Sequence, residues 1–203
     1  ARMASTSARN TCSGRSVARV PRSTCASCNQ ASALRARSAL SGSGSDAICE
    51  FLDEVHPEPT LIGRQAVSRA EARRLVYWFD HKFHAEVTKN LVDEKIMKRF
   101  LGLGEPVSKT IRAGHANIHH HLDYISYLAD RRRWLAGDHM SLADLAAAAH
   151  LSCVDYLGDV PWEQHPSAKD WYARVKSRPS FRPLLEDQIP GAAPAKHYAD
   201  LDF

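Results

Sequence analysis

The sequence predicts a mainly α-helical protein, and three observations lead to this prediction. Between residues 68 and 128, apolar side chains recur at intervals of three and four, which places them on one face of a helix. From residue 142 to residue 157, an alanine-rich apolar run directly follows a helix-capping pattern. Glycine and proline stand between these segments, where helices end. With no internal repeat, the chain of 203 residues is expected to form an all-α bundle.

The first 45 residues differ in composition from the rest of the chain. They contain seven arginines and no lysine, aspartate or glutamate, whereas the remaining residues carry 20 basic and 23 acidic side chains. The formal net charge of +4 therefore comes from residues 1–45 and does not indicate nucleic acid binding by the folded part. Such a segment is typical of a transit peptide, a basic disordered tail or a shifted reading frame over a lost domain. We favour the shifted frame, because an ordinary amphipathic sequence begins abruptly at Asp46.

Two helices are expected in the next part of the chain. The first spans residues 46–55 and is followed by a loop that contains two prolines, at residues 56–59. The second is expected to begin at Ser68, because Glu71 three residues later completes a capping box. The apolar face of this second helix consists of Leu75, Val76, Phe79, Phe83 and Val87. It continues with a bend to Phe100 and is ended by the glycines and the proline of residues 102–106.

A further helix begins at Ser108 and ends in three arginines, residues 131–133, which suit the negative carboxyl end of a helix. Its apolar stripe consists of Ile111, Ile118, Leu122, Ile125 and Leu128. On the same helix His115 and His119 have the spacing of two metal ligands. Because His120 and His121 spread around the helix instead of converging on one point, we expect a solvated or partner-facing helix and no metal.

The strongest local pattern lies at Ser141. The Ser141 hydroxyl can accept a hydrogen bond from the N–H of Asp144, and the Asp144 carboxylate can accept one from the N–H of Ser141. The run from Leu142 to Leu157 carries almost no charge before Asp155, which predicts a helix that is buried on most sides. A buried helix needs such a cap, because water cannot satisfy its first N–H groups.

Characteristic residues flank this helix on both sides. They are Trp134-Leu135-Ala136-Gly137-Asp138 before it, and His165-Pro166, Trp171, Arg174 and Arg178-Pro179-Ser180-Phe181 after it. With the capped helix they resemble the C-terminal helical domain of the cytosolic glutathione transferases. The resemblance implies a glutathione-transferase-like all-α helical bundle at residues 64–190, preceded by a truncated or scrambled thioredoxin-like domain. Residues 46–63 would be the last helix and linker of that domain, and Ser141 and Asp144 would have the structural role of a folding nucleus.

The same resemblance implies where glutathione would bind. In the family, a glutamate–serine pair holds the γ-glutamyl end of the tripeptide, and a Tyr, Ser or Cys lowers the pKa of its thiol. Ser45 matches the serine, but Gly44 stands where the glutamate would be. The Val20-Pro21 pair lies too far upstream to be the cis-proline of the family. The sequence therefore supports a cofactor-binding role for Ser45 alone, and the catalytic residue is unknown.

The carboxyl end, residues 191–203, is short and carries aromatic and acidic side chains. Such a segment buries little by itself, so we expect it to be mobile or bound to something. Its last part, residues 197–203, together with residues 78–83, 86–88, 94–95, 119–124 and 151–162, resembles the glutathione-transferase-like division proteins of alphaproteobacteria, which bind the tubulin homologue FtsZ. This resemblance implies a homodimer that engages the FtsZ filament through a partner-binding tail formed by Asp200, Leu201, Asp202 and Phe203.

Two hypotheses about function follow. The first is a non-catalytic interaction module of cell division that binds FtsZ, and the alternative is a transferase that conjugates glutathione to electrophilic small molecules. No apolar run approaches the roughly 20 residues that cross a bilayer. The five cysteines show no disulfide-framework spacing, which fits a reducing compartment. We therefore expect a cytoplasmic protein with no membrane span and no nucleic acid partner.

Overall fold

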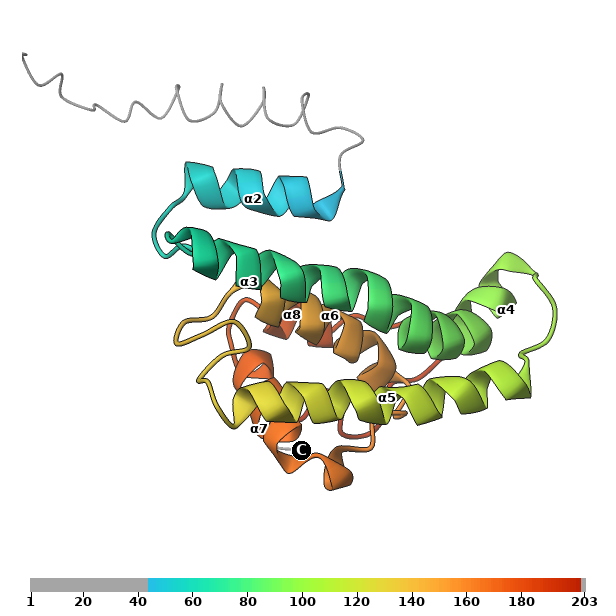
Figure 1. The fold of residues 1–203 in the computed structure, drawn as a ribbon. Coiled ribbons are helices and arrows are strands. Elements are labelled where there is room, and N and C mark those ends of the chain that lie inside the picture. The colour runs from blue at the N-terminus through green and yellow to red at the C-terminus, as the bar shows by residue number, and fades with distance from the viewer. Residues whose placement is uncertain (1–43, 202–203) are drawn as a thin grey trace, which may run out of the picture. The chain divides into compact units, whose positions relative to one another are not determined.

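The computed structural model describes residues 44–201 of the chain. Residues 45–201 belong to one compact unit made of helices, and extended pairing within it is limited to two isolated β-bridges (Figure 1). The helices are α2 (Ser45–Val55), α3 (Ala66–Tyr77), η1 (Trp78–Met97), α4 (Lys98–Leu101), α5 (Ser108–Ala129), α6 (Leu142–Tyr156), η2 (Trp162–Gln164), α7 (Pro166–Lys176) and α8 (Arg182–Leu185). The mainly α prediction is confirmed, while the predictions for residues 1–43 lie outside the described residues. No helix within residues 44–201 is long and apolar enough to cross a membrane.

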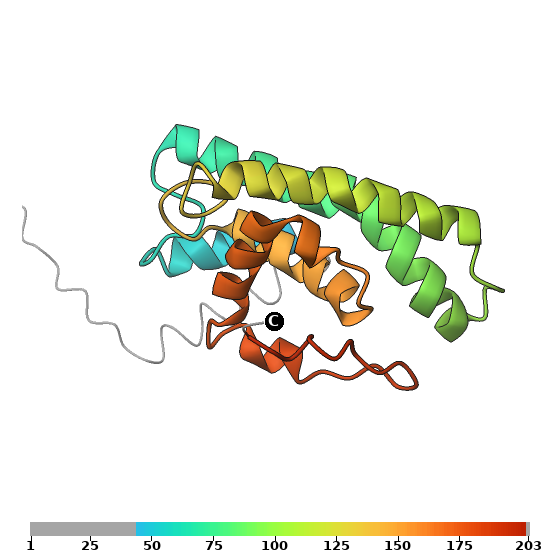
Figure 2. The same ribbon diagram turned by 90° about the horizontal axis from the view of Figure 1, so that it is seen from below.

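The helices α3, η1 and α4 follow one another without a break and run antiparallel to α5 (Figures 1 and 2). Their core row consists of the fully buried Leu75, Phe79, Phe83, Val87 and Leu91. These residues are spaced by four, so on an α-helix of about 3.6 residues per turn the row would drift by about 40° at each step. Instead η1 has π-helical turns, in which an N–H bonds to the carbonyl five residues back, as Lys98 does to Asp93. The row faces α5 and α6, the two helices with which η1 makes most of its contacts.

The helices α3, η1 and α4 together form one long helix. The structure confirms the expected end of this long helix and the expected core face of α5. The long helix ends at Gly102, whose φ of 64° is the left-handed C-cap that glycine adopts without strain. After the loop of residues 103–107, α5 buries the predicted stripe at Ile118, Leu122, Ile125 and Leu128. Packing of this stripe against η1 is the largest contact between two helices of the described chain.

The predicted capping box at Ser68 was wrong. The helix α3 begins at Ala66, with Gln65 as its N-cap, so Ser68 lies inside the first turn. The Glu71 carboxylate accepts hydrogen bonds from the guanidinium groups of Arg74 and Arg132 instead of from the backbone at the start of the helix. The pattern failed because charged groups from other parts of the chain bind this carboxylate.

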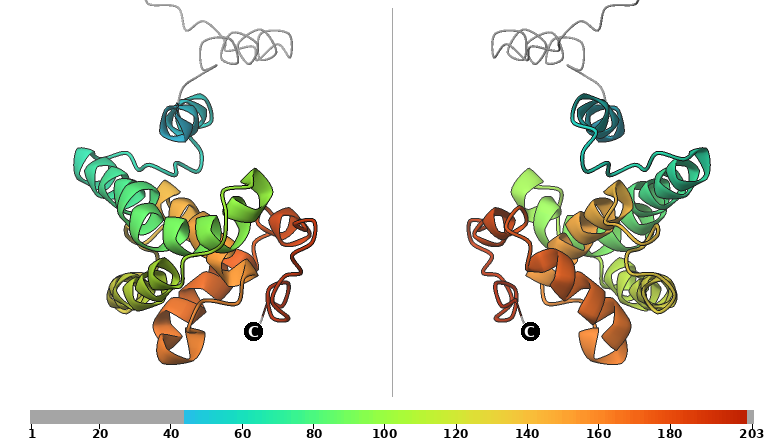
Figure 3. Two further views of the ribbon diagram at one scale, coloured as in Figure 1. Left: turned by 90° about the vertical axis from the view of Figure 1, so that its right-hand side faces the viewer. Right: turned by 90° about the vertical axis from the view of Figure 1, so that its left-hand side faces the viewer.

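The helix α6 lies between the long helix and α7 (Figure 3). Most of its 15 residues are buried, which confirms the prediction made from its low charge. Its first residue, Leu142, donates its N–H to the carbonyl oxygen of Leu61 at 2.9 Å. The N–H groups of Leu61 and Ile62 in turn donate to the Asp53 carboxylate of α2. The linker between α2 and α3 is therefore held at both sides, by α2 and by the start of α6.

Candidate functional site

A segment that we call the C-terminal strap, residues 189–201, lies along α6 and α7 on the side away from α5 (Figures 2 and 3). It begins with a tight turn, in which the N–H of Ala192 donates to the carbonyl oxygen of Ile189 at 3.0 Å. Gly191 at this turn has a φ of 73°. The Arg99 guanidinium of α4 donates to the Gly191 carbonyl oxygen at 3.0 Å. The start of the strap is therefore attached to α4.

Tyr156, at the end of α6, holds the strap at three points. Its hydroxyl donates to the carbonyl oxygen of Ala192 at 2.7 Å and accepts from the N–H of Ile189 at 2.9 Å. Its own carbonyl oxygen accepts from the N–H of Ala195 at 2.9 Å. Both the main chain and the side chain of one buried tyrosine thus fix the strap along α6.

The strap is anchored further along by Tyr198 and His197. Tyr198 is 3% exposed, its ring centroid lies 5.0 Å from that of Tyr156, and its hydroxyl lies 2.8 Å from Ser152 Oγ. Burial raises the pKa of the Tyr198 hydroxyl. His197 Nε2 lies 2.9 Å from Asp155 Oδ1. Because Ser152 and Asp155 are one turn apart on α6, the two strap residues bind to the same face of that helix.

Asp155 and Lys176 form a buried charged pair beneath the strap. Neither side chain is exposed, and Lys176 Nζ lies 3.7 Å from Asp155 Oδ2. Asp155 Oδ1 also accepts from the indole N–H of Trp162 at 2.8 Å, and Lys176 donates to the carbonyl oxygen of His197 at 3.2 Å. Burial lowers the pKa of Lys176, while the carboxylates of Asp155 and Asp200 act in the opposite direction. The charges are thus compensated by each other and by polar groups of the strap.

The predicted partner-binding residues lie at the end of this strap. Asp200 is exposed, Leu201 is partly buried against the main core, and Asp202 and Phe203 lie outside the described residues. We expected a tail that is mobile or bound to something, but up to residue 201 it packs on its own chain. The sequence contained a sign of this packing, because α6 carries a second carboxylate, Asp155, besides the Asp144 of its capping box. The role of the four residues in partner binding stays a prediction.

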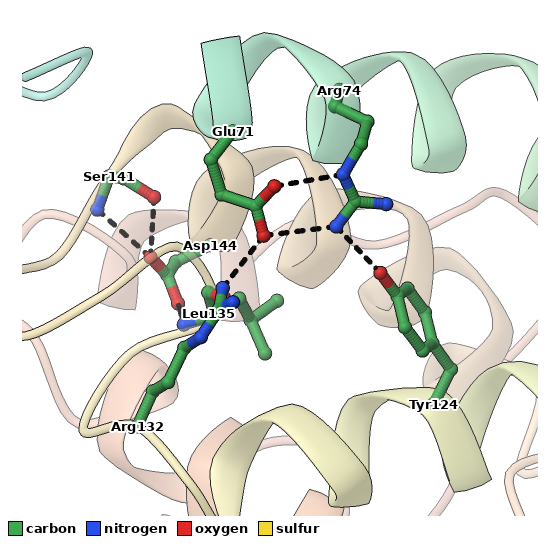
Figure 4. Close-up of polar contacts among 7 residues, drawn as sticks. All are labelled: Glu71, Arg74, Tyr124, Arg132, Leu135, Ser141 and Asp144. Atoms are coloured by element: carbon green, nitrogen blue, oxygen red, sulfur yellow. Dashed lines mark hydrogen bonds and ion pairs between the residues drawn. The ribbon is translucent and has the colours of Figure 1, made fainter. Parts of the chain in front are cut away.

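Asp144 is the centre of a second buried polar cluster, at the start of α6. Its carboxylate accepts from the N–H and hydroxyl of Ser141 at 2.9 and 2.8 Å and from the N–H of Leu135 at 2.9 Å (Figure 4). It also accepts from the indole N–H of Trp171 at 2.9 Å. The capping box is therefore present as predicted, and two further donors bind the same carboxylate. These contacts support a structural role for Ser141 and Asp144.

A charged network lies beside this cluster and joins α3 to α5 (Figure 4). Glu71 binds Arg74 and Arg132, and Arg74 donates to the Tyr124 hydroxyl at 2.8 Å. Hydrogen bonds from Arg74, followed by those from Arg132, lower the pKa of Glu71 to about 2. A carboxylate that is held ionised in this way is suited to fixing helices and not to proton transfer near neutral pH.

Ser45 is the first residue of α2 and is exposed. Its hydroxyl donates to the neighbouring Asp46 carboxylate at 3.4 Å, which is a long and exposed contact. Gly44 has no carboxylate to hold a γ-glutamyl group, so the described residues do not fit the glutathione site of the resemblance. The other residues that such a site needs would lie among residues 1–43, outside the described range.

The histidines of α5 point to different partners. His115 Nε2 lies 3.7 Å from Asp159, and His119 Nδ1 lies 3.0 Å from His165 Nε2. His121 is buried and lies 3.0 Å from Glu86. Within residues 44–201, no group of three or more metal-ligating side chains comes together. The imidazoles of His115, His119 and His121 instead link α5 to neighbouring segments, whereas His120 is exposed.

Comparison with known proteins identifies the family. Residues 116–179 match the family described as "Glutathione S-transferase, C-terminal domain". The chain is also 55% identical over 157 residues to FtsZ-localized protein A of Caulobacter vibrioides, which covers 77% of this chain and 69% of that protein. The chain belongs to the glutathione S-transferase family.

Solved structures agree with this assignment. A glutathione S-transferase from Rhodospirillum rubrum is 64% identical to this family member, with a TM-score of 0.75, covering 77% of this chain and 71% of the other. FzlA from C. crescentus is 54% identical, with a TM-score of 0.76, covering 78% of this chain and 70% of the other. This glutathione S-transferase family member thus spans about seven tenths of the length of its relatives.

Proposed function

We propose that this protein is a non-catalytic interaction module of bacterial cell division that binds FtsZ filaments. The observation that carries the proposal is the identity of 55% over 157 residues to a protein named for its localisation to FtsZ. The match to the FzlA structure, at 54% identity, supports the same function. The described polar clusters bind helices and the strap together, which suits a scaffold.

We place the filament contact at Asp200, Leu201, Asp202 and Phe203. Asp200 is exposed, and its N–H donates to the carbonyl oxygen of His197 at 3.1 Å. A carboxylate on such a turn is accessible to a partner without unfolding of the bundle. Charged groups at the edge of an interface contribute chiefly to the rate and specificity of association.

The test is co-sedimentation of the full chain with polymerised FtsZ. Deletion of the last four residues, and the charge reversal Asp200→Lys, should abolish pelleting with the filament. The control is Asp170→Lys, since Asp170 is also an exposed carboxylate but belongs to α7 and not to the strap. Pelleting of the deletion variant at the level of the unaltered chain would contradict the proposed contact.

We also propose that the protein is a cytoplasmic homodimer. Ile48, Leu52 and Val55 leave an apolar stripe of α2 exposed, with 37, 50 and 46% of their surface accessible. Exposed apolar stripes of this kind are typical of protein interfaces. Light scattering should give the mass of two chains, and Leu52→Asp should shift it towards one.

The alternative function is conjugation of glutathione to an electrophile. The observation that favours it is the identity of 64% to a structure described as a glutathione S-transferase. Calorimetric titration of the full chain with reduced glutathione distinguishes the two functions. Saturable binding would favour the enzyme, whereas no heat of binding by the folded protein would leave the interaction module as the function.

A further inference from the structure

The C-terminal strap is bound more firmly than a passive tail requires. His197 is held on two sides, since its ring nitrogen Nε2 lies 2.9 Å from Asp155 and its carbonyl oxygen accepts from Lys176 at 3.2 Å. Both of these partners are fully buried charges. Burying a carboxylate and an ammonium is costly unless further polar groups complete their coordination. The strap supplies such groups, so its position is coupled to a pair of charges inside the bundle.

The chain passes from buried to exposed within three residues. Tyr198 is 3% exposed and bonds to Ser152, whereas Ala199 and Asp200 are exposed. The turn that joins them is closed by the hydrogen bond from the Asp200 N–H to the His197 carbonyl oxygen. The Asp200 carboxylate opposes part of the effect of burial, which lowers the pKa of Lys176. Its location relative to α6 and α7 therefore depends on His197 and Tyr198, the first two residues of the turn.

We infer that the C-terminal strap is a positioning device, in which His197 and Tyr198, seated on Asp155, Lys176 and Ser152, hold the exposed Asp200 where the partner meets it. This inference rests on the proposed function, in which the end of the chain contacts FtsZ. The physical reason is preorganisation, because ordering a free tail on binding costs conformational entropy. If a released strap occupies the competent geometry for a tenth of the time, its apparent affinity falls about ten-fold.

A strap that only stabilised the bundle would behave differently. Its loss would lower the melting temperature, but the fraction that stays folded would bind the filament with unchanged affinity. Strap release and bundle stability can be followed separately through tryptic cleavage at Lys196, whose side chain is exposed but whose neighbours Ala195 and His197 are held on α6. Cleavage there is detected by mass, as loss of residues 197–203. Protection of Lys196 therefore reports on the strap alone.

The experiment compares three variants of the full chain with the unaltered protein. Tyr198→Ala removes the anchor, and Tyr198→Phe keeps the buried ring but loses the bond to Ser152. The control is Ile118→Ala, at a fully buried residue of α5, the helix that lies on the side away from the strap (Figure 3). Each protein is tested for tryptic cleavage at Lys196, for melting temperature and for FtsZ affinity by co-sedimentation at a temperature where it is folded.

We expect Tyr198→Ala to speed tryptic cleavage at Lys196 and to weaken filament binding by about ten-fold or more, the size expected when the competent fraction falls to a tenth. Tyr198→Phe should stay within about three-fold of the unaltered chain, because most of the anchoring surface remains. Ile118→Ala should lose stability while both Lys196 protection and affinity are retained. If Tyr198→Ala does not fold, His197→Ala replaces it, because it removes the bond to Asp155 from a ring that is about a third exposed.

The outcomes separate this inference from the proposed function. Should the unaltered chain pellet with FtsZ and Tyr198→Ala bind equally well although trypsin cleaves it faster at Lys196, the positioning role is overturned and the function stands. Equal weakening by Ile118→Ala and Tyr198→Ala at equal loss of melting temperature would also overturn it, since the strap would then be structural. Failure of the unaltered chain to pellet would remove the proposed function and the inference together.

Discussion

Replacement of Asp144 by alanine should destabilise the fold by several kcal/mol. The change removes the acceptor of three buried N–H donors, those of Leu135, Ser141 and the Trp171 indole, each bound at 2.9 Å. A buried donor left without a partner costs about 1–3 kcal/mol. Allowing for partial relaxation, we expect a loss of about 3–6 kcal/mol in the free energy of unfolding. This is a large share of the roughly 5–15 kcal/mol that holds a typical domain folded.

The isosteric change Asp144→Asn separates the contribution of the donors that bind Oδ1 from that of the donors that bind Oδ2. Leu135 and Trp171 both donate to Oδ1, whereas both donors of Ser141 bind Oδ2. An amide can keep its oxygen at the first position but places an NH₂ group at the second. Only the Ser141 N–H then lacks an acceptor. The Ser141 hydroxyl can turn to accept a hydrogen bond from the NH₂ group of Asn at position 144. We expect a loss of about 1–3 kcal/mol, the cost of one unsatisfied donor.

Urea unfolding followed by far-ultraviolet circular dichroism measures both variants. The slopes of the transitions should stay equal, so that the midpoints report stability directly. Asp170→Ala, an exposed change on α7, serves as the control and should lie within about 0.5 kcal/mol of the unaltered chain. An Asp144→Ala variant within about 1 kcal/mol of this control, well below the sum of the lost acceptors, would refute the reasoning.

Three further outcomes are expected. Burial lowers the pKa of His121 in the folded protein from its ordinary value of 6.5. The His121 imidazole therefore binds a proton more tightly in the unfolded chain than in the folded protein. Stability should therefore fall as the pH drops below 6.5, and His121→Gln should reduce that slope in urea titrations at neutral and acidic pH. Gly191→Ala should lower the free energy of unfolding by about 1–2 kcal/mol, as measured by thermal denaturation. The φ of 73° at this position is strained for alanine, and the new Cβ would meet the Arg99 guanidinium. Phe83→Ala, at a fully buried ring, should cost about 3–5 kcal/mol in chemical denaturation.

Features whose partners are close in sequence could be predicted from the residues alone. The capping box of Ser141 and Asp144 depends on atoms three residues apart, and the C-cap at Gly102 depends on one backbone angle. The same kind of pattern misled at Ser68. There the Glu71 carboxylate binds Arg132, 61 residues further along the chain, and the helix begins at Ala66, before Ser68. A local motif holds only where no distant charge competes for the same group.

The C-terminal strap depends on contacts that no periodicity encodes. The hydrogen bond between Ser152 and Tyr198 spans 46 residues, and the contact between Asp155 and His197 spans 42. Composition indicated aromatic and acidic groups in the tail, but it could not distinguish packing on the same chain from packing on a partner. Likewise, Ser45 could be matched to the glutathione site, while the geometry around it depends on residues outside the described range.

The two buried carboxylates of α6 give the protein a pair of optical reporters. Asp144 binds the indole of Trp171 near the first turn, and Asp155 binds the indole of Trp162 near the last. Indole emission responds to a negative charge at its N–H, so each ring reports on its own end of the helix. Release of the C-terminal strap disturbs Asp155 and hence the emission of Trp162, whereas Trp171 senses the cap. Because Trp78 and Trp134 emit as well, variants that keep only Trp162 or only Trp171 would let intrinsic fluorescence distinguish loss of the strap from loss of the fold without any added label.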